Sequence, residues 1–151
     1  MKGKNSKGIT LIALVITVIV LLIIATISIN YGMEIAQKSN IESIKTNMLL
    51  IEAKSKLYAE EYNFSGDANS LYGTVASSVT DETVQNFISG VGSSYASYYY
   101  LSLQDLSEMG LSINKGYYLV NYDINNFEVV YVTGVELEGN VYYTLTDIRG
   151  L

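Results

Sequence analysis

Acidic side chains are the residues of this chain best suited to chemistry, because the sequence contains neither histidine nor cysteine. That composition removes the commonest general base, the serine–histidine and cysteine–histidine nucleophiles, disulfides and most zinc sites. Acid–base catalysis or calcium binding would have to rely on carboxylates. Closely spaced carboxylates occur at Glu60 with Glu61, at Asp81 with Glu82, and at Glu136 with Glu138.

We interpret these carboxylates as solvated surface and turn residues. Neighbouring residues on a helix or a strand point in different directions, so the adjacent pairs do not converge on one site. Asp123 and Asn125 match part of a calcium loop, but the positions after them do not continue the motif. We therefore expect no enzymatic activity, no cofactor and no metal.

Tyrosines are a second group with the chemistry to bind a ligand. Aromatic clusters bind glycans or make adhesive surfaces, but tyrosine is also a favoured strand residue with a polar end. We interpret them chiefly as packing residues. The tyrosines concerned are Tyr95, Tyr98, Tyr99, Tyr100, Tyr117, Tyr118, Tyr142 and Tyr143.

Charge is unevenly distributed along the 151 residues, a length that suits one domain. The net charge is −6, and three of the nine basic residues, Lys2, Lys4 and Lys7, lie in the first eight positions. The remainder has six basic and fifteen acidic residues, a net charge of −9. Because such a body repels phosphate backbones, we expect no direct binding of nucleic acid.

The most apolar part of the chain lies near its N-terminus. Residues 8–33 contain no charge, and residues 9–29 include fifteen Ile, Leu or Val. As a helix this 21-residue segment would be about 32 Å long, close to the roughly 30 Å of a bilayer's hydrocarbon core. In lipid every peptide group must be bonded within the segment, so the sequence predicts a membrane-spanning helix.

The basic residues before this segment predict its orientation. Lys2, Lys4 and Lys7 place the N-terminus in the cytoplasm and the C-terminal part outside, as a single-pass plasma membrane protein. A secretory signal peptide has a shorter apolar run, of about 7–15 residues, and an A-x-A-like cleavage site, which is lacking here. A lipoprotein signal needs a cysteine. A plain signal anchor stays open on hydropathy alone.

The junction Lys7-Gly8-Ile9-Thr10-Leu11-Ile12 resembles the leader of type IV prepilins and secretion pseudopilins, especially those of Gram-positive, clostridia-like type. In that family a prepilin peptidase cuts after the glycine and methylates the new N-terminal amine. The resemblance covers roughly the first 30 residues closely. It implies a leader of residues 1–8, cleavage between Gly8 and Ile9, and N-methylation of Ile9.

One position departs from the family pattern. Most major pilins have a glutamate at the fifth mature position, where this chain has Ala13. The family's glutamate is thought to meet the N-terminal amine of a neighbouring subunit, since a charge in an apolar filament core is costly without a partner. The departure fits a minor or specialised subunit, or a lineage that assembles without this pair.

The resemblance implies a structural subunit of a type IV pilus-like or pseudopilus filament at the cell surface. The implied partners are other pilin subunits through a helix at residues 9–33, prepilin peptidase, the assembly ATPase and platform, and membrane lipid. The alternative is a membrane-tethered extracellular binding module that does not polymerise.

After the apolar segment the pattern becomes amphipathic and predicts a continuation of the helix over residues 34–62. One stripe at helical spacing comprises Ile41, Ile44, Met48, Ile51, Ser55, Tyr58 and Tyr62. We interpret it mainly as the face on which the C-terminal domain packs, with a helix–helix interface as the alternative. Gly32 near the join allows a bend, and the polar run at 65–70 predicts the end of the helix.

Residues 63–151 predict a globular domain, and the whole chain an α+β fold in which an antiparallel meander packs on the outer half of the long helix. Helices are expected at 81–89, with Thr80 as N-cap, and at 103–109, and strands at 117–122, 127–133 and 141–146. In the last strand Val141, Tyr143 and Leu145 alternate with Tyr142, Thr144 and Thr146, which predicts one buried face. Turns are expected at 123–126 and at Gly139-Asn140, and Gly90-Val-Gly92 lacks the pattern of a phosphate loop and predicts a flexible linker.

Overall fold

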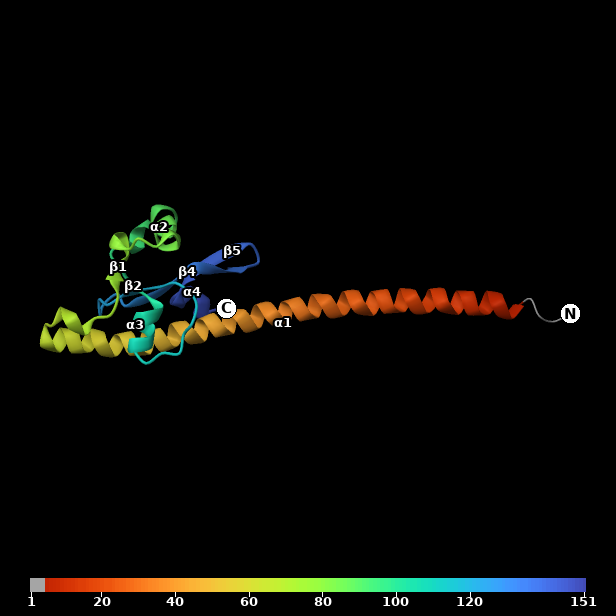
Figure 1. Cartoon of the computed structure of the whole chain (residues 1–151), viewed down its shortest axis with the longest axis horizontal. Helices are drawn as coiled ribbons and strands as arrows, with labels where there is room; N and C mark the ends of the chain where they lie inside the picture. Colours follow the sequence, from red (N-terminus) through yellow and green to blue (C-terminus); the bar gives the residue numbers. More distant parts are fainter. Residues whose placement is uncertain (1–4) are drawn as a thin grey trace. The chain divides into compact units, whose positions relative to one another are not determined.

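Helix α1, Asn5–Ser65, is the longest element of the computed structural model (Figure 1). The structure describes residues 5–151, without the side chains of residues 5–7, 30 and 31. Helix α1 contains both predicted helical segments, 9–33 and 34–62, and its helical backbone continues through Gly32. The chain divides into two compact units, Met1–Asn40 and Ile41–Leu151.

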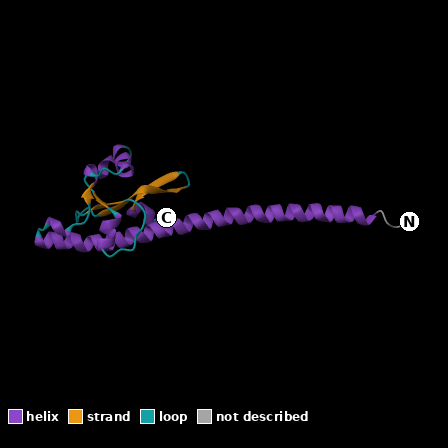
Figure 2. Ribbon diagram, viewed as in Figure 1, coloured by secondary structure: helices purple, strands orange, loops and turns teal. Residues whose placement is uncertain are grey.

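The unit from Ile41 to Leu151 combines helices with one antiparallel sheet, so the predicted α+β fold is confirmed (Figure 2). The five strands are hydrogen-bonded in chain order, which makes the sheet a meander. The strands are β1 (Thr74–Val75), β2 (Tyr99–Leu101), β3 (Tyr118–Asn121), β4 (Glu128–Leu137) and β5 (Asn140–Thr144). The shorter helices are α2 (Glu82–Ser89), α3 (Leu103–Glu108) and α4 (Leu145–Arg149). Three 3₁₀ turns complete the unit: η1 (Ala68–Ser70), η2 (Ala76–Ser78) and η3 (Ser93–Tyr95).

Both faces of the sheet are covered, because successive strand residues point to opposite sides. On one side Tyr118 of β3 joins Met48 of α1 in the larger apolar cluster, which also includes side chains of α3 and α4. On the other side Leu119 and Val130 pack with Val84 of α2 in a smaller cluster. The sheet therefore lies between α1 and α2.

The domain half of α1 buries the predicted stripe. Met48, Ile51 and Ser55 are fully buried, Ile41 and Ile44 are 8% exposed, Tyr58 is half-buried, and Tyr62 is 40% exposed. Ala59, which the stripe did not include, is also buried. The interpretation of this stripe as the packing face of the C-terminal domain is confirmed from residue 41 to residue 58.

The helix starts depend on side-chain caps. Thr80 as N-cap of α2 is wrong, because the carboxylate of Asp81 accepts hydrogen bonds from the N–H groups of Thr83 and Val84, at 2.9 and 3.3 Å. Aspartate is among the strongest N-caps, ahead of threonine. Helix α3 begins with a capping box between Ser102 and Asp105.

The strand predicted at 141–146 differs from β5 in two ways: β5 ends at Thr144, and both of its faces are packed instead of one. The hydroxyl of Thr144 accepts a hydrogen bond from the N–H of Asp147 at 3.2 Å, which caps α4 and ends β5. Tyr142 packs with the larger apolar cluster and Tyr143 with the smaller one, so both faces of β5 are used. The strands β1 and β2 were not predicted, because each is only two or three residues long.

The turn between β4 and β5 lies one residue earlier than predicted. Glu138 and Gly139 both have positive φ, at 52° and 82°, as a two-residue hairpin loop requires, and Asn140 already belongs to β5. The predicted turn at 123–126 is confirmed by a hydrogen bond from the N–H of Asn126 to the carbonyl of Asp123 at 3.0 Å.

The predicted flexible linker at Gly90-Val-Gly92 is wrong. Gly92 is buried and donates its N–H to the carbonyl of Phe87 at 2.9 Å. A Cβ at Gly92 would overlap the ring of Phe87, with Cζ only 2.7 Å away. This glycine is therefore needed for the close approach of the backbone to an aromatic ring.

Candidate functional site

The exposed aliphatic side chains of residues 9–29, called here the apolar helix surface, are the most unusual feature of the first unit. All fifteen Ile, Leu and Val side chains in this range are 46–67% exposed. Scattered exposed aliphatic residues are normal in soluble proteins, but a contiguous surface of this kind marks a contact with lipid or protein. Among the described residues α1 is the helix that is long and apolar enough, by length and composition, to cross a membrane.

Hydroxyl groups within the apolar helix surface bond back to the helix. The hydroxyl of Thr17 donates to the carbonyl of Ala13 at 2.6 Å, and that of Thr26 donates to the carbonyl of Leu22 at 2.8 Å. A polar group that enters hydrocarbon without a partner costs several kcal/mol, on the order of 4–8 for a hydroxyl or amide. These two threonines are therefore compatible with an apolar environment.

The sequence-predicted processing residues lie at the start of α1. Gly8 and Ile9 are both in the helix, Ile9 is 67% exposed, and a Cβ at Gly8 would meet no atom within 4 Å. A glycine inside a helix weakens it by about 0.5–1 kcal/mol relative to alanine, which favours local opening at this peptide bond. Lys2 and Lys4, and the side chain of Lys7, lie outside the described residues.

Ala13 is exposed on the first part of α1, four residues after Ile9. Its methyl group adds to the apolar character of this surface and carries no charge for a neighbouring amine. The position is open to solvent, so the structure leaves room there for contact with another molecule.

The acidic residues do not gather into a metal site. No group of three or more aspartate, glutamate, histidine or cysteine residues within the described part of the chain is placed to hold a metal ion. Asp81 caps α2, Glu60 and Glu61 are exposed near the end of α1, and Glu136 and Glu138 are exposed on β4 and in the turn after it.

The carboxylate of Asp123 is engaged in hydrogen bonds within the turn at 123–126. It accepts hydrogen bonds from the Asn126 side chain and the Asn125 N–H, both at 3.0 Å. These bonds hold the pKa of Asp123 below its ordinary value, with the Asn126 side chain as the larger cause. The carboxylate therefore stabilises its own turn.

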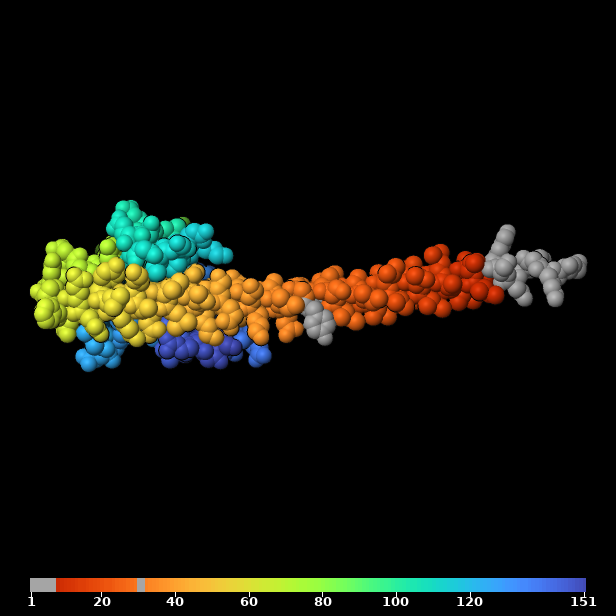
Figure 3. All heavy atoms as spheres, turned by 90° about the horizontal axis from the view of Figure 1, so that it is seen from below, coloured from red at the N-terminus to blue at the C-terminus, as the bar shows by residue number. Residues whose placement is uncertain are grey.

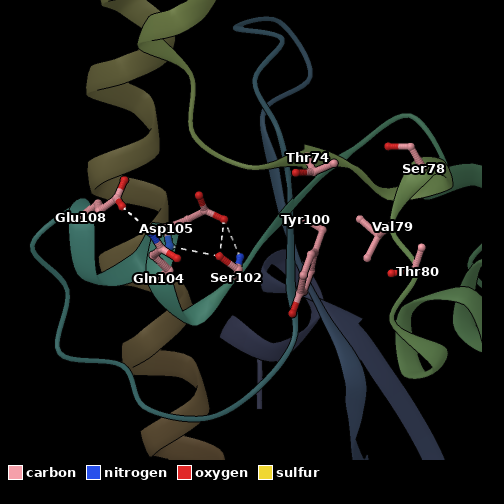
Figure 4. Close-up of a pocket in the computed structure, with 9 residues that line it drawn as sticks. All are labelled: Thr74, Ser78, Val79, Thr80, Tyr100, Ser102, Gln104, Asp105 and Glu108. Atoms are coloured by element: carbon pink, nitrogen blue, oxygen red, sulfur yellow. Dashed lines mark hydrogen bonds between the residues drawn. The ribbon is translucent and has the colours of Figure 1, made fainter.

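A hollow of about 480 Å³ lies between β1, η2, β2 and α3 (Figure 4). Its acidic lining is already paired: one carboxylate oxygen of Asp105 accepts from the Ser102 N–H and hydroxyl, at 2.8 and 2.6 Å. Gln104 donates to Glu108 at 2.9 Å. These contacts serve the capping box and one turn of α3, so this hollow is not the site that the sequence features indicate.

The predicted tyrosines pack within the domain, as their interpretation requires. Tyr118 is buried and the other seven are half-buried. Tyr98 donates its hydroxyl to Glu128 at 2.9 Å, and burial followed by this carboxylate raises its pKa to about 12. Tyr100 stacks on Tyr117, with ring centroids 6.3 Å apart.

Sequence reasoning missed a line of exposed apolar residues on the domain half of α1. Leu50, Leu57 and Phe64 are 46%, 62% and 96% exposed. Their spacing of seven residues was visible in the sequence. These residues lie on the side of α1 away from the buried stripe, whose periodicity dominates the sequence pattern.

Comparison with known proteins identifies no relative: no family model, curated protein or solved structure matches this chain.

Proposed function

We propose that this chain is a structural subunit, minor or specialised, of a type IV pilus-like or pseudopilus filament. The observation that carries the proposal is the apolar helix surface, whose fifteen large aliphatic side chains are 46–67% exposed, directly after the Gly8–Ile9 junction. The unit Met1–Asn40 offers these side chains no burial of its own among the described residues. Their partners must come from lipid or from other chains.

Membrane anchoring comes first in this proposal. Fifteen aliphatic residues at about 0.3–0.6 kcal/mol each favour insertion by roughly 5–9 kcal/mol. Prepilin peptidase then removes residues 1–8 and methylates Ile9, which leaves the apolar segment on the mature chain. The acidic domain after it faces the cell exterior.

Assembly exchanges lipid contacts for contacts between like helices. Because lipid tails are as apolar as leucine, the gain comes from packing rather than from escape from water. An assembly ATPase and its platform supply the work of extraction. Without a glutamate at position 13, the new N-terminal amine has no carboxylate partner there, which favours a minor or specialised rank over a major pilin.

The competing proposal is a membrane-tethered extracellular module that never polymerises. Ala13 favours it, since the charge pair that aids assembly in the family is missing. The packed tyrosines do not add support, because all eight are buried or half-buried within the domain. Recovery of the chain in filaments sheared from cells would exclude this alternative.

Intact-mass spectrometry of the mature chain, produced with a prepilin peptidase, tests the processing step. The expected species begins at Ile9 and carries one methyl group. The variant Gly8→Leu should keep residues 1–8, whereas the matched control Gly3→Leu, also in the leader, should be processed like the natural chain. A natural chain that begins at Met1 or Lys2 in the presence of the peptidase would contradict the proposal.

A further inference from the structure

We propose that the hollow between β1, η2, β2 and α3 is a binding site for an uncharged sugar of a glycan. The site lies within the folded domain, and its chemistry does not depend on whether the chain assembles into a filament. The volume of the hollow is about 480 Å³. Small-molecule sites in proteins span roughly 300–1,000 Å³, so the hollow is large enough for a ligand of this class.

The strand register brings a hydroxyl group and an aromatic ring to one wall of the hollow. Thr74 of β1 lies directly opposite Tyr100 of β2, so their side chains are on the same face of the sheet. The Tyr100 ring stacks on Tyr117, with the two rings inclined by 22°. Figure 4 shows Tyr100 between the residues of α3 on one side and those of η2 and the segment after it on the other. The ring offers an apolar surface against which the C–H groups of a sugar can pack.

Hydroxyl groups that line the hollow are not used by the fold. Thr80 directly precedes α2, but Asp81 is the N-cap, so the hydroxyl of Thr80 has no capping role. Thr74 and Thr80 are both exposed, and neither hydroxyl has a hydrogen-bond partner within the described part of the chain. The Tyr100 hydroxyl also has no such partner there, and burial, followed by the charge of Asp81, raises the pKa of Tyr100 above its ordinary value. All three hydroxyls can therefore donate to a ligand at neutral pH.

Carboxylates of α3 provide acceptors on the other side of Tyr100. Asp105 uses one oxygen for its two hydrogen bonds with Ser102, and Glu108 uses one for the Gln104 amide. The second oxygen of each carboxylate has no partner among the described residues, and a hydroxyl that donates to a carboxylate makes one of the stronger hydrogen bonds. In Figure 3 the segment that contains α3, in teal and cyan, lies on the molecular surface beside the domain half of α1, so a ligand can reach this side from solvent.

The combination of free donors and free acceptors selects the ligand class. Among the described residues that line the hollow none is basic, so Asp105 and Glu108 would repel an anion. An apolar ligand would leave the polar groups of the lining without partners. Sugar hydroxyls both donate and accept, so one ring can bond to the threonines and to the carboxylates together. An organic cation would bond to the acceptors alone, and it is the competing class that the test must separate.

A glycan array tests the ligand class. The probe is the full chain in a polyoxyethylene detergent, whose headgroup is neither a sugar nor charged, and the array holds uncharged, acidic and basic glycans. The natural chain should bind at least one uncharged glycan and no acidic glycan. Its affinity for the corresponding free sugar, measured by titration calorimetry, should be the same at low and at high salt, because salt screens only charges.

A double variant locates the binding. Thr74→Val/Thr80→Val removes two hydroxyls and nearly keeps the shape of both side chains, so the affinity should fall about two- to tenfold for each hydroxyl, the effect of one hydrogen bond. The matched control Thr83→Val/Thr133→Val changes exposed threonines on α2 and β4 that do not line the hollow, and should bind like the natural chain. The unfolding midpoint of both variants checks that the domain is folded.

Three results would overturn the sugar site. Binding of basic glycans alone, weakened by salt, would make the hollow a cation site. Equal affinity of the natural chain and the double variant would place the sugar elsewhere, and an array without a bound uncharged glycan would remove the ligand. A chain that is found in sheared filaments but binds no sugar overturns only this inference, whereas a chain that binds sugar but is absent from filaments overturns only the filament role.

Discussion

The two halves of α1 use apolar residues in opposite ways. In residues 9–29 all fifteen large aliphatic side chains are 46–67% exposed, whereas Met48 and Ile51 in the domain half are fully buried. The domain half is amphipathic and finds its partner, the sheet, within the same chain. The first half is apolar on every side, and its side chains are exposed within the described structure.

This difference separates two kinds of apolar residue that composition alone treats alike. Buried residues of the domain half contribute to the free energy of unfolding through transfer from water and close packing. Under the proposed function, the exposed residues of the first half contribute instead to the free energy of membrane insertion or assembly. A substitution in the domain half should therefore change the free energy of unfolding, and a substitution in the first half should change membrane insertion or assembly.

The largest expected effect is the loss of packing at Ile51. Ile51→Ala should lower the free energy of unfolding of the domain by about 2–5 kcal/mol, because it leaves a cavity at a fully buried position. The matched control Ile23→Ala, at a position 55% exposed, should leave it unchanged. Urea unfolding of the detergent-solubilised chain, followed by near-ultraviolet circular dichroism, measures both. Equal losses from the two variants would contradict the division between the halves.

The second effect should appear in the membrane and not in the domain. Ile19→Lys should weaken insertion by roughly 2.5–3.5 kcal/mol, the cost of a lysine near the centre of a spanning helix. The share of the chain in the alkaline extract should rise relative to the natural chain, although most stays in the membrane pellet, while its urea midpoint stays the same. Ile35→Lys, at an exposed position beyond the apolar helix surface, is the control and should stay in the pellet.

A smaller effect is expected from the cap of α2. Asp81→Ala should lower the free energy of unfolding by about 0.5–2 kcal/mol, because two N–H groups at the helix start lose their acceptor. Glu82→Ala, the next residue and also an acid, caps nothing and should have less effect. A larger loss from Glu82→Ala would show that charge at this helix end, and not the cap, stabilises it.

The smallest effect concerns alkaline pH. Burial, and then the Glu128 carboxylate, raise the pKa of Tyr98 from 10.0 to about 12, so the folded state keeps a proton that the unfolded state has lost. Stability should therefore fall as pH rises from about 10 to about 12. Tyr98→Phe should reduce this fall in stability. Glu128→Gln should raise the pKa of Tyr98 less, and so narrow the pH range over which stability falls. An unchanged slope in Tyr98→Phe, measured by urea unfolding across this range, would contradict the assignment.

Much of the helical architecture could be predicted from the sequence, because periodicity over many residues is a strong signal. The stripe from Ile41 to Tyr58 is buried as expected, and α1 ends at Ser65, directly before Gly66. Strands β1 and β2 are too short to show a period. The role of Gly92 depends on the position of the Phe87 ring, which no local pattern reveals.

The candidate site was only partly predictable for a related reason. The apolar helix surface is evident from residues 9–29 alone, since its signal is composition. The line of exposed apolar residues on the domain half of α1 is harder to predict, because Leu50, Leu57 and Phe64 become unusual only once Met48 and Ser55 are known to be buried. The end of β5 was missed because the capping hydroxyl of Thr144 outweighs the strand pattern of its neighbours.

Mass spectrometry of filaments sheared from the cell surface tests the central claim most directly. We expect this fraction to contain the chain, with a methylated Ile9 as its first residue. A chain that is absent from the sheared fraction and remains in the membrane with Lys2 and the rest of the leader attached would contradict it.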